Sequence, residues 1–237
     1  MGTLTLALLY ATLAGATIPL GGLTARVEHF RREWLQREFR HGVIAFGGGV
    51  LLAAVALVLV PEGTRHLPTA ASAAALGLGG VVAMLADRAI ERRGGAGAQL
   101  MALLLDYVPE AMALGATLAT DPSLGLLLAL LIALQNYPEG FNAYCELRDG
   151  AGIASGRVLA GLTAAVLLGP LAAVIGLAVL ADAPAALGVG RLAAAGGILY
   201  LTFQDIAPEA KLDCDWGPPL GAVLGFLLGM VGHQLIG

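Results

Sequence analysis

The sequence predicts an all-α, polytopic membrane protein, and three observations carry this prediction. Hydrophobic residues make up 58% of the 237 residues and charged residues only 13%, whereas a soluble domain averages about 25% charged residues. The apolar residues gather in eight runs, each long enough to cross a bilayer. The cations cluster in alternate loops between these runs. We therefore expect a single transmembrane domain over residues 1–237, with lipid as its solvent and no soluble domain.

Residues that break helices separate the eight runs. We expect spans at about 2–24, 41–62, 71–90, 99–120, 123–145, 157–181, 189–210 and 216–236. Pro68, Gly94-Gly95, Asp121-Pro122 and Pro184 stand between successive runs, and Gly and Pro are the strongest local markers of turns. The first run has no Lys or Arg before it, unlike a secretory signal peptide, so we interpret it as a retained helix.

The placement of the cations predicts the orientation. Of the 13 Lys and Arg residues, 11 fall in alternate loops, namely Arg26, Arg31, Arg32, Arg37, Arg40, Arg88, Arg92, Arg93, Arg148, Arg157 and Lys211. Only Arg65 and Arg191 fall on the other side. Because cytoplasmic loops are enriched in cations, we expect both termini outside. The alternation also supports the count of eight spans, since one missed helix would disrupt it.

Two features leave alternatives open. The polar stretch 25–41 carries apolar residues at approximate helical spacing, so it could lie along the membrane interface or form a charged loop. Small residues recur at four-residue spacing in two spans: Gly161, Ala165, Gly169 and Ala173 in the sixth, and Gly217, Gly221, Gly225 and Gly229 in the eighth. Such stripes favour close helix contact, which we expect within the chain, with a homodimer as the alternative.

Two central spans contain acids and amides at bilayer depth. Asp106 and Glu110 are four residues apart and so share one helix face, as do Gln135 and Glu139, with Asn136 three residues before Glu139. The two spans contain no Lys or Arg to neutralise these acids, apart from Arg148 at the end of the fifth. Carboxylates buried in lipid without a counter-charge need protons or a metal ion.

Prolines add a further source of oxygen ligands. Pro109 and Pro138 each clash with the carbonyl four residues back, which is expected to free the oxygens of Leu105 and Leu134. Two such helices facing each other predict a cage of oxygen ligands that suits a divalent cation. Three more acids are candidate pathway residues, each also explicable as a solvated helix end: Glu62, Asp205 and Glu209.

Other residue types point to no additional chemistry. The histidines all lie near expected span ends, where we interpret them as interfacial: His29, His41, His66 and His233. Cys145 and Cys214 form no spaced metal motif. We find no nucleophile–base pair and no cofactor motif, so we expect neither an enzyme nor a nucleic-acid-binding protein.

At the acidic motifs the sequence resembles the ZIP (Zrt-/Irt-like) family of divalent metal transporters. The family's fourth helix carries His-Asn-x-Pro-Glu-Gly, where this chain has Asp106-Tyr107-Val108-Pro109-Glu110-Ala111. The similar motif of its fifth helix is matched more closely, by Gln135-Asn136-Tyr137-Pro138-Glu139-Gly140. Residues 47–54 and 199–210 resemble the second and seventh helices of the family. The resemblance covers nearly the whole chain, and it implies a compact eight-helix bundle with alternating access by a moving helix block.

The resemblance implies uptake of divalent ions such as Zn²⁺, Mn²⁺, Fe²⁺ or Cd²⁺ across the plasma (inner) membrane. It implies one metal site, built by Asp106, Glu110, Gln135 and Glu139, with Asn136 as a further candidate. Asp106 stands where the family usually has His, and Gly169 where it has a Glu that serves a second metal. An all-oxygen site favours harder ions such as Mn²⁺ or Mg²⁺. The alternatives are a ZIP-like sensor or assembly protein that no longer transports, and a transporter of a non-metal solute.

Overall fold

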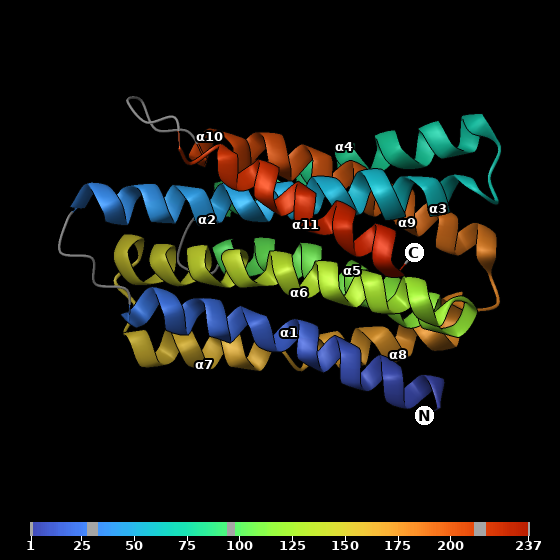
Figure 1. Cartoon of the computed structure of the whole chain (residues 1–237), viewed down its shortest axis with the longest axis horizontal. Coiled ribbons are helices and arrows are strands. Elements are labelled where there is room, and N and C mark those ends of the chain that lie inside the picture. Colours follow the sequence, from blue (N-terminus) through green and yellow to red (C-terminus); the bar gives the residue numbers. More distant parts are fainter. Residues whose placement is uncertain (1, 28–32, 94–97, 211–216, 237) are drawn as a thin grey trace.

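Long helices that run along one common axis make up this protein (Figure 1). The computed structural model describes residues 2–27, 33–93, 98–210 and 217–236, and these contain helices and no strand. The helices are α1 (Thr3–Val27), α2 (Glu33–Ala54), α3 (Val60–Thr64), α4 (Thr69–Arg93), α5 (Ala98–Thr120), α6 (Pro122–Cys145), α7 (Ser155–Ala165), α8 (Leu168–Leu180), α9 (Pro184–Leu201), α10 (Ala207–Glu209) and α11 (Leu220–Ile236). The predicted all-α class is confirmed.

Six helical segments are long and apolar enough to cross a membrane. They are Thr3–Val27, Glu38–Thr64, Thr69–Ile90, Pro122–Arg148, Ser155–Leu180 and Pro184–Ile206. Two further helices lie alongside them in Figure 1: α5, which has 23 residues and contains Asp106 and Glu110, and α11, which is apolar but has 17 residues. The protein is therefore a helical bundle of the membrane-embedded type.

Three prolines account for the interruptions within the long segments. Pro170 clashes with the carbonyl of residue 166, and there α7 ends and α8 begins. Turns of π-helix, η1 (Val55–Leu59) and η3 (Thr202–Ile206), contain the residues four before Pro61 and Pro208. A third π-turn, η2 (Glu146–Gly150), follows α6. Pro109 and Pro138, in contrast, lie inside continuous α-helices.

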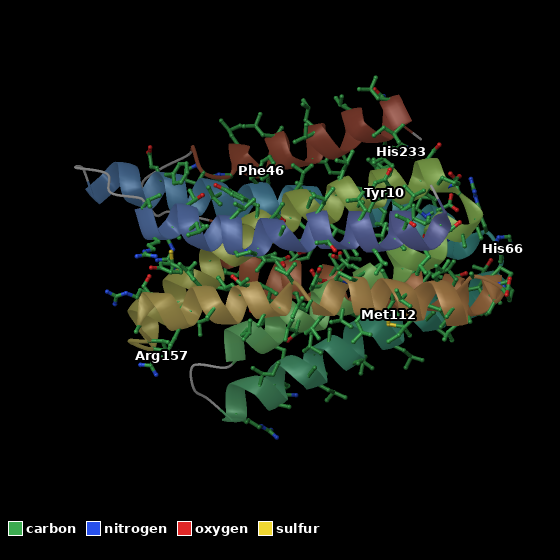
Figure 2. The ribbon with its side chains drawn as sticks, turned by 90° about the horizontal axis from the view of Figure 1, so that it is seen from below. Tyr10, Phe46, His66, Met112, Arg157 and His233 are labelled. Atoms are coloured by element: carbon green, nitrogen blue, oxygen red, sulfur yellow. The ribbon has the colours of Figure 1, made fainter. Side chains whose placement is uncertain are left out.

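The two ends of the bundle differ in charge. The end of α1 and the starts of α2 and α7 lie at the same end, which we call the arginine-rich end (Figure 1). Arg157 marks this end in Figure 2, and His66, in the turn after α3, marks the opposite end. Residues 28–32 and 211–216, which include His29, Arg31, Arg32, Lys211 and Cys214, lie outside the described residues.

The polar stretch 25–41 is described only in part. Residues 25–27 complete α1 and residues 33–41 begin α2, so the stretch ends one helix and starts the next. The ring of Phe39 packs edge-on against that of Phe141, with centroids 6.1 Å apart. This contact attaches the start of α2 to α6 rather than to lipid alone.

The helices form two groups, which occupy the lower and upper halves of Figure 1. The first group is α1, α5, α6, α7 and α8, in which α1 packs along α6 and α5 along α8. The second group is α2, α3, α4, α9 and α11, in which α4 packs along α9 and α2 along α11. The groups meet chiefly where α2 lies against α6 and where α5 lies against α9.

Glycines bring backbones into direct contact within each group. A Cβ on Gly115 would overlap the Ala173 carbonyl oxygen, and one on Gly225 would overlap that of Phe46. Between the groups the contact is with side chains instead: the nearest atom to a Cβ on Gly47 would be Cγ of Pro138, at 2.7 Å. The small residues of α11 therefore face α2 of the same chain, as predicted, and each group is packed more closely than the boundary between them.

Candidate functional site

The predicted acids of the fourth and fifth spans meet between α5 and α6. Asp106 and Glu139 neighbour each other, and Glu110 lies near enough for the three carboxyl groups to interact through their charges. The i,i+4 spacing on α5 and on α6 places these side chains on facing sides of the two helices. The convergence that the spacing predicts is therefore present in the fold.

Glu110 is tied directly to the amide of Gln135. The Nε2 atom of Gln135 donates a hydrogen bond to Oε2 of Glu110 across the α5–α6 contact. Glu110 is 3% exposed and Gln135 is fully buried. Among the described residues, no Arg, Lys or His forms an ion pair with any of the three carboxylates. A negative charge this deep is costly without a positive partner, so the arrangement favours an incoming cation or a proton.

Three acceptor oxygens on one turn of α6 have no hydrogen-bond donor. They are Oε1 of Gln135, Oδ1 of Asn136 and Oε2 of Glu139, all of which are buried. Leaving a buried acceptor unpaired costs about 1–3 kcal/mol. Three such oxygens in one turn, next to two more acids, form a site that a hard cation would stabilise by direct coordination.

A cavity of about 260 Å³ leads from these acids toward the arginine-rich end. Its wall includes Asp106 and Glu139 at the inner limit, and Asp205, which is exposed, near the end of α9. Asp87 and Glu146 add two more carboxylates to the wall. The site is thus reached through an acidic passage on one side of the bundle.

The side chains of Asn136 and Tyr107 donate hydrogen bonds to backbone carbonyl oxygens of α1. Asn136 is fully buried, and its Nδ2 donates to the carbonyl oxygen of Ala14 on α1, at 3.1 Å. The hydroxyl of Tyr107 donates to the carbonyl oxygen of Ala11, at 3.3 Å. This hydroxyl fills the space where a Cβ on Gly169 would lie. Asn136 therefore joins α6 to α1, with only its oxygen left for a metal.

The candidate pathway residues fall at both ends of the bundle. Glu62 lies at the opposite end, where its carboxylate forms an ion pair with Arg65 at 2.9 Å and with Arg191 at 3.8 Å. Asp205 lines the cavity at the arginine-rich end. The side chain of Glu209, on α10, lies outside the described side chains. Glu62 and Asp205 therefore lie at opposite ends of the bundle and do not form one site.

Sequence reasoning missed three polar residues in the wall of the passage and one buried arginine at the opposite end of the bundle. Asn142 on α6 and Glu146 at the start of η2 follow Glu139 at the i+3 and i+7 positions, so their helical spacing could have identified them. Nδ2 of Asn142 donates to Oε1 of Glu146 at 2.8 Å. Asp87 accepts a hydrogen bond from the hydroxyl of Tyr200 at 2.9 Å. Arg191 was counted only as a loop cation, although it is 5% exposed.

The donor set fits a cation only if amide oxygens take part. In the described part of the chain, no three His, Cys, Asp or Glu side chains are grouped closely enough to hold a metal ion alone. The hydrogen bond to Gln135 directs Glu110 toward that amide. The unpaired oxygens of Gln135 and Asn136 would then complete the coordination that the carboxylates begin.

Comparison with known proteins adds no assignment. No protein-family model matches the sequence, and no curated protein is significantly similar to it. The class that the fold and site define is therefore a membrane-embedded helical bundle with a buried acidic site.

Proposed function

We propose that this protein transports divalent metal cations across the plasma (inner) membrane, into the cytoplasm, in the manner of the ZIP family that its motifs resemble. In this proposal the six long segments, α5 and α11 make eight spans, both termini are outside, and the arginine-rich end faces the cytoplasm. The transported ion binds among Asp106, Glu110, Gln135 and Glu139, with the Asn136 oxygen as a further ligand.

One observation carries the proposal: the three unpaired oxygens of a single α6 turn, on Gln135, Asn136 and Glu139, lie beside Asp106 and Glu110. A buried site with several acceptors and no paired cation is stable only when something positive enters it. The passage lined by Asp205, Asp87 and Glu146 supplies a route with negative charge along its length.

The division into two helix groups supports an alternating-access mechanism. Each group is joined internally by close backbone contacts, as at Gly115 and Gly225, whereas side chains separate the groups at Gly47. Rigid groups with a looser boundary can move relative to each other while their own packing is kept. The ion would bind on α5 and α6 of the first group and leave through the acidic passage.

Uptake by proteoliposomes tests the proposal. Purified protein is reconstituted in vesicles that contain a divalent-cation-sensitive dye, and Mn²⁺ or Cd²⁺ is added outside. We expect dye quenching with the natural sequence and a loss to the level of empty vesicles in Glu110→Ala and Glu139→Ala. Asp182→Ala is the matched control, because Asp182 is an exposed acid in the turn between α8 and α9. Normal uptake in both site variants would refute the assignment.

A transport-inactive ZIP-like protein is the second candidate. It is favoured by the lack of a grouped set of three His, Cys, Asp or Glu ligands in the described residues and by Tyr107, which fills the space beside Gly169. The same vesicles decide between the two, since this candidate predicts no dye quenching with the natural sequence. Metal binding is measured separately, by isothermal calorimetry with Mn²⁺.

A further inference from the structure

A buried arginine lies at the opposite end of the bundle, remote from the acidic passage. Arg191 on α9 is 5% exposed, and its Nη2 donates a hydrogen bond of 2.6 Å to Oγ1 of Thr117 on α5. Thr117 is fully buried, and its own hydroxyl donates to the Ala113 carbonyl oxygen at 2.7 Å. The hydroxyl oxygen is thereby oriented to accept from the guanidinium, and a charged donor in a low-dielectric site makes a strong bond.

The remaining contacts of Arg191 hold it on its own helix group. Its Nη1 lies 3.8 Å from Oε2 of Glu62 on α3. Arg65 also donates to this oxygen, at 3.1 Å, and lies 2.9 Å from Oε1 of the same carboxylate. Nε of Arg191 has no hydrogen-bond partner. The guanidinium is thus anchored by α3 and α9 in the second group and reaches across to Thr117 in the first.

At the arginine-rich end, one polar contact between the groups is longer. There Nη2 of Arg40 on α2 lies 3.5 Å from Oδ1 of Asn142 on α6, at the limit of a hydrogen bond. Asn142 also lines the acidic cavity, so that end is hollowed beside its contact. A short, buried, charged bond closes one end of the boundary, and a long contact at a cavity marks the other.

We propose that Arg191 is a latch, which holds the two helix groups together at the end opposite the acidic passage through its bond to Thr117. Opening that end requires the hydrogen bond between Arg191 and Thr117 to break, while the ion pair with Glu62 holds the guanidinium within the second group. The latch rests on the proposed function in one respect: transport would require the opposite end to open in turn with the arginine-rich end. The bond itself controls the balance between a closed and an open form of this end.

Pulsed electron paramagnetic resonance in lipid nanodiscs measures that balance without any metal. Spin labels are placed at Ala119→Cys and Ala186→Cys, two exposed positions on α5 and α9 near the latch, with Cys145→Ala and Cys214→Ala as background. The natural sequence should give one dominant short distance. Thr117→Val keeps the side-chain shape but removes the acceptor, and it should raise the ratio of long to short distances by roughly tenfold, as expected for a lost hydrogen bond to a charged group.

Two control variants separate the latch from a general effect on the helices. Thr117→Ser keeps the acceptor and should restore the short distance. Thr163→Val removes a hydroxyl that bonds the carbonyl four residues back, at 2.7 Å, but lies exposed on α7, and it should leave the distances unchanged. An unchanged distribution in Thr117→Val, with folding verified by gel filtration and thermal unfolding, would overturn the latch. A shift in protein that takes up no metal would keep the latch and reject the transporter.

Discussion

The two ends of the boundary between the helix groups are built in contrasting ways. At the arginine-rich end, a cavity with Asp87, Glu146 and Asp205 in its wall leads inward to the acids of α5 and α6. At the opposite end, Arg191 of α9 is buried and donates a hydrogen bond to Thr117 of α5. The difference teaches that the two ends use charge in different ways: acids line a cavity at the arginine-rich end, whereas a buried cation joins the groups at the opposite end.

The contrast also separates two uses of charge in a membrane interior. The site has unpaired oxygens on Gln135, Asn136 and Glu139, and its acids have no counter-ion in the described part of the chain. Arg191, in contrast, is held by a hydroxyl and a carboxylate. Acids that bind and release a cation need oxygens without permanent partners. A buried cation that holds two helix groups together needs hydrogen-bond and ion-pair partners.

The largest expected effect is on access from water. In the cysteine-free background, Leu201→Cys, which lies on the cavity wall, should react with a hydrophilic maleimide about 100-fold faster than Leu118→Cys, a buried position next to Thr117 that leaves the latch intact. This factor corresponds to a free energy of a few kcal/mol for local opening of the structure at the closed end. Mass spectrometry of the labelled protein gives both rates. Equal rates would remove the asymmetry between the ends.

The next effect concerns the type of ion. Asp106→His replaces one hard oxygen by nitrogen, so it should shift the preference from Mn²⁺ toward Zn²⁺ by roughly tenfold. Competition between the two ions in vesicle uptake measures the preference. Asp87→His is the matched control, since Asp87 lines the passage but belongs to neither α5 nor α6. An equal shift in both variants would mean that Asp106 has no special place in the site.

A smaller effect tests whether each helix group is rigid. Gly115→Ala forces a Cβ against the backbone of Ala173, so we expect a loss of about 1–3 kcal/mol in the free energy of unfolding. Gly77→Ala, on α4, meets no atom within 4 Å and should gain about 0.5–1 kcal/mol, because alanine favours the helix. Thermal unfolding in detergent ranks the two. Tolerance of Gly115→Ala would contradict close packing within the first group.

The smallest effect comes from Tyr107. Tyr107→Phe removes a hydroxyl that donates to the Ala11 carbonyl, so it should lower the free energy of unfolding by about 1 kcal/mol and leave cation uptake intact. Thermal unfolding and vesicle uptake are measured on the same preparation. Loss of uptake at unchanged stability would show that the hydroxyl belongs to the site rather than to the packing of α1 against α5.

The sequence predicted the convergence of the acids and amides better than the partners around them. The spacing of Asp106 and Glu110, and of Gln135 and Glu139, is a local property of a helix, so it survives into the fold. The partner of Asn136 could not be predicted, because the Ala14 carbonyl lies on another helix 122 positions away. Its position in the sequence predicted Asn136 as a ligand candidate. In the fold, its amide nitrogen donates a hydrogen bond to the Ala14 carbonyl oxygen.

The latch was beyond the reach of the sequence for a similar reason. Arg191 and Thr117 are 74 positions apart, and nothing in either segment indicates that they meet. The charge count placed Arg191 at the outer side of the membrane, because it is the third residue of the span expected at 189–210. In the fold α9 begins earlier, at Pro184, which carries Arg191 into the buried part of the helix.

The central claim is that a divalent cation binds between α5 and α6, and anomalous diffraction tests it most directly. Crystals soaked with Mn²⁺ or Cd²⁺ should give an anomalous peak within about 2–2.6 Å of carboxylate or amide oxygens from Glu110, Gln135 and Glu139. The peak should disappear in Glu139→Ala. Occupied peaks only at surface acids such as Asp182, with none between the two helices, would contradict the account.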